Sequence, residues 1–119
     1  MTWILDKERP ISPQLMEQLC ARIANGILKP DERLWSVREL ALNAGVNPNT
    51  VQKTYEMLEA KGLLYSVRNT GWFVADNITA AKAETERLLH AKTQRYFEEL
   101  RLLGFSDREI IDYVKGWEE

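Results

Sequence analysis

The feature that most constrains the fold is the stretch SVRELALNAGVNPNTVQKTYEMLEAKG, which begins at Ser36. Ser36 and Glu39 have the spacing of a capping box, in which a hydroxyl and a carboxylate satisfy free amides at a helix start. Gly45 can adopt the left-handed backbone conformation that ends such a helix. Asn47 is a favourable N-cap, and Pro48 then takes the first helical position, where its missing N–H has no cost. The stretch therefore predicts two short helices joined by a tight turn.

Two helices joined in this way are typical of a helix-turn-helix, whose second helix can enter the major groove of DNA. We expect both helices to bury an apolar face in one core. The expected core positions are Val37, Leu40 and Ala41 on the first helix and Val51, Tyr55 and Leu58 on the second. The pattern indicates a DNA-binding protein.

Another helix is predicted before this motif. Residues 3–11 look extended, Ser12 is the expected N-cap, and Pro13 is the expected first helical residue. A turn over 29–32 and a short edge strand over 33–35 lead to the motif. The apolar residues at helical spacing are Leu15, Met16, Leu19, Cys20, Ile23 and Ile27.

The segment LLYSV-RNTG-WFVA follows the motif directly. Two apolar runs that flank an Asn- and Gly-containing turn predict a β-hairpin. A helix-turn-helix followed by a hairpin is the winged-helix arrangement, and a change in composition at Asp76 and Asn77 marks the expected domain boundary. We predict a mainly α fold with a small β wing: a winged helix-turn-helix domain over 1–76, then a helical segment over 77–119.

Two further helices are predicted in residues 77–119, one over 78–103 that ends at Gly104 and one that begins with a capping box at Ser106 and Glu109. Such a small segment buries too little apolar surface to be stable alone. A symmetric homodimer is the most common solution. The expected dimerisation residues are Leu88, Leu89, Tyr96, Leu100, Leu103, Phe105, Ile110, Val114 and Trp117.

The charge of the chain is unusual for a nucleic-acid binder, since 16 Lys and Arg stand against 18 Asp and Glu, a net charge of −2. Nine basic and eight acidic residues lie in 1–75, against seven and ten in 76–119. A protein that relies on bulk charge to bind phosphates is more basic than this. We expect affinity to come from a few placed contacts, doubled by dimerisation.

The composition favours a cytoplasmic protein that is not an enzyme. No apolar run approaches the roughly 20 residues needed to span a bilayer, and the segment MTWILDKERP has no signal-peptide core. Cys20 stands alone, so there is no disulfide framework. His90 has no second ligand at metal-binding spacing, and nothing resembles a nucleophile with its base. We expect no metal, no cofactor and no catalysis.

The chain from Arg9 to Val74 resembles the winged-helix domain of the GntR family of bacterial transcription factors. The resemblance is carried by SVREL, VNPNTV, YEMLEAKGLL and the RNTG wing. The VNPNTV start and the short two-helix tail are similar to the YtrA-like subfamily. Two residues depart from the family pattern, because Trp35 stands where it has Pro and Asn69 replaces the first wing glycine. Asn also tolerates left-handed backbone angles, so we expect the wing to form.

The resemblance implies a regulator that binds a palindromic operator as a homodimer, more often as a repressor than as an activator. Operons for membrane transporters are frequent targets in the YtrA-like group. The expected DNA-binding residues, from the motif and from the resemblance, are Ser36, Arg38, Asn47, Pro48, Asn49, Thr50, Gln52, Lys53, Tyr55, Arg68, Thr70 and Gly71.

Some of these side chains have structural alternatives. Arg38 either contacts DNA or pairs with a nearby glutamate such as Glu39 or Glu56. Asn47 is engaged if it caps its helix. Gln52 either reads adenine or is an ordinary surface residue. Tyr55 either packs in the core or binds phosphate through its hydroxyl.

Two other functions fit parts of the sequence. Near-neutral charge suits a winged helix used as a protein-interaction module, although the small polar residues that open the recognition helix lack apolar anchors. The C-terminal helices could instead sense a small effector in a pocket between subunits. The aromatic residues that would line such a pocket are Tyr96, Phe105, Tyr113 and Trp117.

Overall fold

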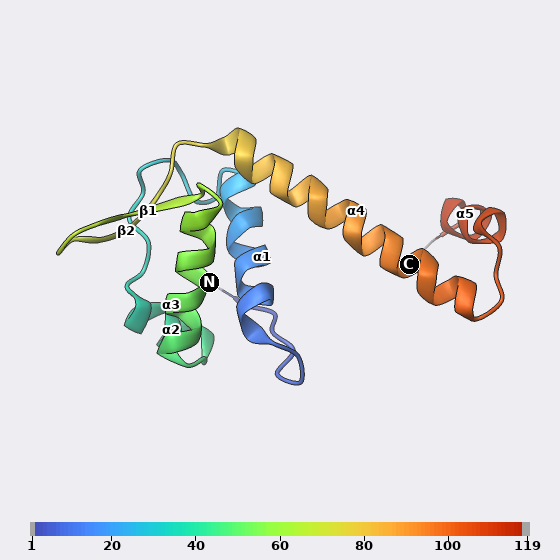
Figure 1. Ribbon diagram of the computed structural model, residues 1–119, viewed down its shortest axis with the longest axis horizontal. Coiled ribbons are helices and arrows are strands. Elements are labelled where there is room, and N and C mark those ends of the chain that lie inside the picture. Colours follow the sequence, from blue (N-terminus) through green and yellow to red (C-terminus); the bar gives the residue numbers. More distant parts are fainter. Residues whose placement is uncertain (1, 118–119) are drawn as a thin grey trace. The chain divides into compact units, whose positions relative to one another are not determined.

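The computed structural model describes residues 2–117. It is mainly helical with one two-stranded antiparallel sheet, which confirms the predicted fold class (Figure 1). The elements, in chain order, are α1 (Ile11–Ala24), α2 (Val37–Ala44), α3 (Pro48–Ala60), β1 (Leu64–Val67), β2 (Gly71–Val74), α4 (Ile78–Leu102) and α5 (Asp107–Lys115).

The predicted start and stop signals of the helix-turn-helix are confirmed. The hydroxyl of Ser36 accepts from the backbone N–H of Glu39 at 3.1 Å, and the Glu39 carboxylate accepts from the backbone N–H of Ser36 at 2.8 Å. Gly45 ends α2 with a left-handed φ of 69°. The Asn47 side chain caps α3 by accepting from the backbone N–H of Asn49 at 2.8 Å. These local contacts therefore define where α2 ends and where α3 begins.

The start of α1 differs from the prediction. The helix begins at Ile11, one residue before the expected cap, so Ser12 lies inside it. Ser12 is buried, and its hydroxyl lies 3.0 Å from the hydroxyl of Thr54 on α3. The prediction of Ser12 as N-cap was wrong because the side chain pairs across the core, which no local pattern reveals.

The end of α1 also differs. The helix ends at Ala24, and Ile27, which the helical spacing had assigned to the apolar stripe, lies beyond it and is exposed. Leu28 is buried in its place. Gly26 has a φ of 73°, so the chain turns there and a different side chain faces the core.

The wing is a hairpin in which Tyr65 pairs with Phe73 and Val67 pairs with Gly71. Asn69 adopts a left-handed φ of 64° at its tip, as the prediction required. The expected edge strand over 33–35 reduces to a single antiparallel bridge between Arg33 and Phe73.

One core joins the three helices of this domain to the wing. The predicted core positions Leu40, Ala41, Val51, Tyr55 and Leu58 are all buried. Val37 is only partly buried and packs on the edge of this core. The other members of the core are Leu15, Met16, Leu19, Cys20, Ile23, Ala24, Leu28, Leu34, Leu63, Leu64, Val74 and Ala81.

Contacts divide the chain into two compact units between Thr85 and Glu86, inside α4. The first turns of α4 belong to the winged-helix unit, because Ala81 is fully buried in its core. The carbonyl of Ala81 accepts from the thiol of Cys20 at 3.6 Å.

The second unit comprises the rest of α4 and the short helix α5. Ser106 and Glu109 form the predicted capping box at the start of α5. The guanidinium of Arg101 makes two hydrogen bonds with the carboxylate of Asp107, at 2.7 and 2.9 Å. Ile110 is buried within this unit. Among residues 2–117 no helix is both long and apolar enough to cross a membrane.

Candidate nucleic-acid interface

The first turns of α3 present a small polar face. Pro48, Asn49, Gln52 and Lys53 are exposed, and Thr50 is half-buried. Of these side chains, Asn49, Thr50 and Gln52 carry both donors and acceptors, and Lys53 carries donors only. In a helix-turn-helix this is the part of the second helix that reaches base edges, while the amides at the helix start face phosphate.

Asn47 and Gln52 are each held by a neighbour. The carbonyl oxygen of the Asn47 side chain is used in capping, which leaves its NH₂ group as the available donor. The Gln52 side-chain nitrogen donates to the carboxylate of Glu56, one turn later, at 2.9 Å. Both side chains therefore have a defined orientation in the unbound protein.

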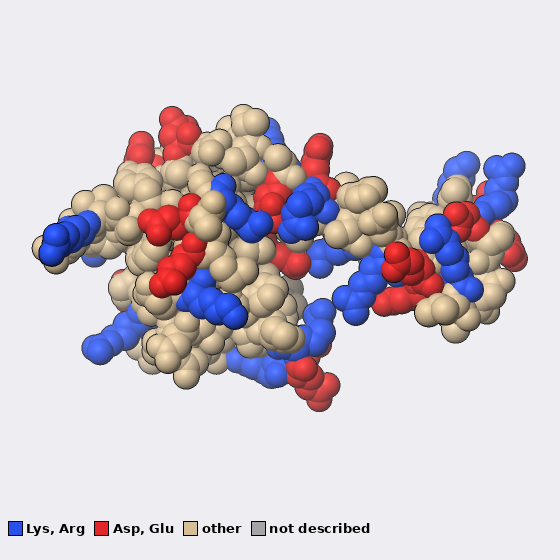
Figure 2. All heavy atoms as spheres, viewed as in Figure 1, with Lys and Arg blue, Asp and Glu red and all other residues tan. Residues whose placement is uncertain are grey.

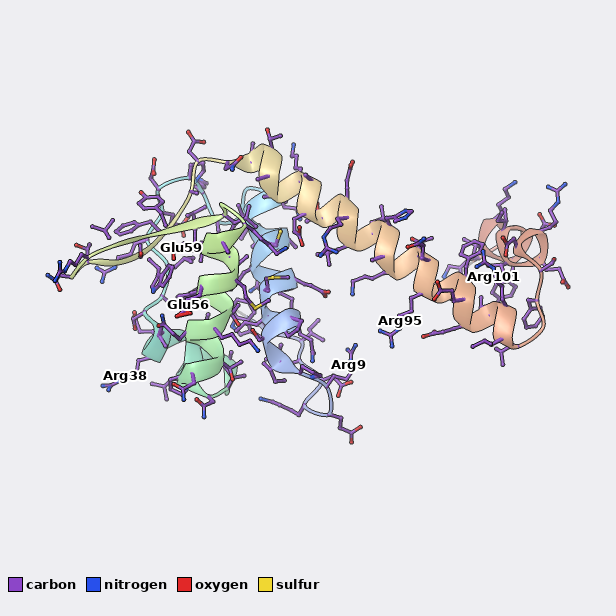
Figure 3. The ribbon with its side chains drawn as sticks, in the orientation of Figure 1. Arg9, Arg38, Glu56, Glu59, Arg95 and Arg101 are labelled. Carbon is purple, nitrogen blue, oxygen red and sulfur yellow. The ribbon has the colours of Figure 1, made fainter. Side chains whose placement is uncertain are left out.

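Arg38 extends from the first turn of α2, away from the ribbon (Figure 3). It is exposed, and among the described residues none forms an ion pair with it. The alternative that Glu39 or Glu56 holds it is not seen, since Glu39 accepts from the Ser36 N–H, Glu56 accepts from Gln52, and neither forms an ion pair with Arg38. The backbone N–H and then the hydroxyl of Ser36 hold the pKa of Glu39 below its usual range. The N–H groups of the Arg38 guanidinium are therefore available as hydrogen-bond donors to a phosphate or a base.

Tyr55 belongs to the core, so the expectation that it contacts DNA is corrected. The side chain is fully buried, and its hydroxyl donates to the backbone carbonyl of Trp35 at 2.8 Å. Burial, followed by the charge of Glu39, raises the pKa of the Tyr55 hydroxyl. Its ring packs at 5.4 Å from Trp72 of the wing. Tyr55 therefore ties α3 to the start of α2 and to the wing.

The wing turn contains Arg68, Asn69 and Thr70, all exposed, and ends at Gly71. Basic surface lies at the tip of the wing in this view, and Arg68 is the basic residue of the turn (Figure 2). A flexible basic side chain at a hairpin tip is the form that reaches phosphates or a narrow minor groove.

Arg33 is a basic residue at the wing that the sequence did not point out. A Cβ placed on Gly71 would lie 3.4 Å from the Arg33 Nε, so its guanidinium rests against the end of the wing. The backbone of Arg33 bridges to Phe73. Because this approach depends on pairing between distant segments, no local signal could have revealed it.

The N-terminal arm is a second feature that sequence reasoning missed. The backbone of Ile4 exchanges two hydrogen bonds with the Gln18 side chain on α1, at 3.1 and 2.7 Å. The indole N–H of Trp3 donates to the side chain of Asn43 on α2 at 2.7 Å. The ammonium of Lys7 donates to the carbonyl of Gly45 at 2.7 Å. The arm thus braces α1 against the turn of the helix-turn-helix.

Many of the residues expected in a dimer contact are exposed. Leu89 is 67% exposed, Leu103 is 72% exposed and Trp117 is 60% exposed. Tyr96, Phe105 and Val114 are exposed as well, Leu88 and Leu100 are half-buried, and Ile110 is buried inside its own unit. In the described part of the second unit, over residues 86–117, three further exposed large apolar residues were not in the expected set: Leu102, Ile111 and Tyr113.

A cavity of about 390 Å³ lies within the second unit and is lined by Tyr96, Leu100, Phe105, Glu109, Ile110 and Tyr113. Its walls are mostly apolar. Glu109 is already engaged by the backbone N–H of Ser106 at 2.9 Å. Tyr96, Phe105 and Tyr113 of the predicted aromatic set line it, and Trp117 does not.

Comparisons with known proteins agree with this geometry. The family described as "Bacterial regulatory proteins, gntR family" matches residues 11–74. The HTH-type transcriptional repressor YtrA of Bacillus subtilis (strain 168) is 39% identical over 107 residues, which cover 89% of this chain and 82% of that protein. A GntR family transcriptional regulator from Listeria monocytogenes has a similar structure, with a TM-score of 0.81 and 31% identity. That similarity covers 96% of this chain and 100% of the other.

The similar structures include complexes with operator DNA. AraR(DBD) in complex with operator ORE1 has a TM-score of 0.53 and 32% identity, over 63% of this chain and 94% of that chain. The family match, the full-length relative and the operator-bound neighbour all point to the same function. The chain is a DNA-binding transcription regulator that belongs to the GntR family, in its YtrA-like subfamily.

Proposed function

We propose that the protein is a transcriptional repressor that binds a palindromic operator as a homodimer in the cytoplasm. The single observation that carries the proposal is the polar, exposed start of α3 beside Arg38, which has no ion-pair partner within residues 2–117. Helix-turn-helix dimers place two such helices in successive major grooves, about one helical turn or roughly 10 base pairs apart. The operator-bound AraR neighbour and the name of the YtrA relative support DNA binding and repression respectively.

Within this proposal the contacts divide into readout and positioning. Asn49, Gln52 and Lys53 face the bases, with the Asn47 NH₂ group beside them. Asn and Gln suit adenine, and Lys suits guanine. The positioning residues on phosphate are Ser36, Arg38, Thr50, Arg68, Thr70 and Gly71, of which Gly71 acts through its backbone N–H. Pro48 has no N–H to donate, so its part is to pack at the start of α3 beside the DNA backbone. Tyr55 is left out because it is buried.

The second unit supplies the dimer contact in this proposal. Large apolar side chains such as Leu89 and Leu102, which is 89% exposed, are costly to leave in water. A symmetric pairing covers the same patch on both subunits. The net charge of −2 favours dimerisation, since each subunit alone has no excess of positive charge to attract phosphate.

A second candidate role for this unit is effector sensing. The cavity of about 390 Å³ falls in the size range of small-molecule sites and has aromatic walls. An effector bound there changes operator affinity only if it binds the DNA-competent and DNA-free dimers with different strength. Genes for a membrane transporter are the regulated operon that we propose, from the likeness to the YtrA-like group.

Selection from a random DNA pool tests the proposal. The full chain should enrich one palindromic sequence with half-sites about ten base pairs apart. Repression is then measured with a reporter gene placed behind the selected operator. Enrichment of no sequence, or of an asymmetric one bound by a single chain, would overturn the proposal.

A further inference from the structure

The second half of α3 carries two glutamates, Glu56 and Glu59, on a helix that the proposed function inserts into DNA (Figure 3). Each has a different partner. Glu56 accepts from the side-chain nitrogen of Gln52 at 2.9 Å, whereas Glu59 accepts from the hydroxyl of Ser66 on β1 at 3.0 Å. Glu56 is therefore linked to the reading face of α3, and Glu59 is linked to the wing.

The contact with Glu56 determines how the Gln52 amide is oriented. An ionised carboxylate only accepts hydrogen bonds, so the Gln52 atom that faces it must be the NH₂ nitrogen. That nitrogen has a second hydrogen, which stays available together with the carbonyl oxygen. The side chain thus keeps one donor and one acceptor for a further partner, and this is the pair that glutamine uses to bind N7 and N6 of adenine.

We propose that Glu56 is a positioning residue, which holds the Gln52 amide in the orientation that reads adenine at one position of each half-site. The inference rests on the proposed function, because it requires α3 to lie in the major groove. Guanine presents two acceptors, N7 and O6, in place of adenine's acceptor and donor. An amide held in this orientation by Glu56 places its carbonyl oxygen opposite the guanine O6. Two acceptors then face each other, and guanine is disfavoured.

Glu56 also has a general effect on binding. Its charge repels nearby phosphates whatever the sequence, so it lowers affinity for all DNA. Holding Gln52 before binding reduces the side-chain freedom that is lost on complex formation. The Gln52–Glu56 pair therefore lowers affinity for all DNA and raises the preference for one base pair.

The test measures the affinity of the full chain for every single-base variant of its selected operator. Wild type should prefer adenine at one position per half-site by roughly tenfold, and Gln52→Ala should abolish that preference. Glu56→Ala should reduce the preference to about twofold while raising affinity for all sequences. Glu56→Gln should reduce the preference as well, because the new amide can either accept from the Gln52 NH₂ group or donate to its carbonyl oxygen and so no longer fixes its orientation.

Glu59→Ala is the matched control, because it removes the same charge from the same helix without touching Gln52. It should raise affinity for all sequences and leave every base preference unchanged. If Glu56→Ala behaves like this control, or weakens all positions equally, the positioning role is refuted. The role is also refuted if no position responds to Gln52→Ala. Wild-type protein that selects no sequence at all would overturn the proposed function itself, which is a distinguishable result.

Discussion

Replacement of Tyr55 by Phe separates a core role from a DNA contact at this position. The change removes one hydroxyl and keeps the buried ring and its contact with Trp72. The hydroxyl donates at 2.8 Å to the carbonyl of Trp35, the residue that precedes the cap of α2. Without it, that carbonyl loses the partner that joins α2 to α3.

The expected cost follows from the burial of this bond. A buried acceptor left without its partner costs about 1–3 kcal/mol of unfolding free energy, and since this bond is part-buried we expect a loss near the lower end, about 1 kcal/mol. In a domain of this size each kcal/mol lowers the melting temperature by roughly 4–8 °C. We therefore expect Tyr55→Phe to melt several degrees lower and to bind operator with unchanged affinity at a temperature where it is folded.

Circular dichroism melts and operator titrations at low temperature provide the two readouts. Tyr65→Phe is the control, since its hydroxyl bonds the carboxylate of Asp31 at an exposed site, and it should change stability by no more than about 0.5 kcal/mol. An unchanged melting temperature for Tyr55→Phe together with weaker operator binding would refute the core assignment. It would show instead that the hydroxyl contacts DNA.

Three further perturbations test other parts of the protein. Arg38→Ala should leave the melting temperature nearly unchanged. It should make the slope of log binding constant against log salt concentration shallower by about 0.9 for each phosphate that the side chain neutralises. Arg95→Ala on α4, whose partner is Glu99, should change neither the melting temperature nor this slope. Lowering the pH should weaken the capping box of α2. The Ser36 N–H holds the pKa of Glu39 below its usual range, so this stabilisation is complete above the ordinary glutamate pKa of about 4.3 and is lost as the pH falls through the lower folded value. Melting temperatures across this range should therefore fall more steeply for wild type than for Glu39→Gln, and parallel curves would contradict the role of the box. Truncation after Thr85, which keeps the buried start of α4, should give a folded monomer by sedimentation with much weaker operator affinity; a truncated dimer would place the subunit contact elsewhere.

The parts of the fold that depend on neighbours in the chain could be predicted from the sequence. The box of Ser36 and Glu39, the left-handed Gly45 and the Asn47 cap all form as expected, because each involves residues within three or four positions. Asn69 likewise fulfils the backbone requirement of its turn without help from the core.

The errors lie where distant segments meet. Ser12 reads as a cap, but it pairs with Thr54 across the core. Helical spacing assigns Ile27 to the apolar stripe, although the turn at Gly26 buries Leu28 instead. Helical spacing places Tyr55 in the core, but only the position of the Trp35 carbonyl shows that the Tyr55 hydroxyl is engaged there and is not free to bind phosphate.

The candidate site shows the same division. The motif predicts which residue types lie at the start of α3, but it does not predict which partners their side chains have. Three features of the site depend on side-chain geometry between separate turns or segments. Arg38 has no ion-pair partner in the described part of the chain, Glu56 holds Gln52, and Arg33 rests on the wing. Charge patterning along the chain could not supply that geometry.

The proposed function requires that two copies of this domain, joined through their second units, read one operator. A titration of the selected operator with full-length protein at physiological salt, with mass measurement of the complex, tests this requirement without intermediate steps. We predict two chains per duplex and an affinity about a thousandfold or more above that for a scrambled duplex of equal length. A complex of one chain per duplex, or equal affinity for both duplexes, would show that the paired reading of one operator is wrong.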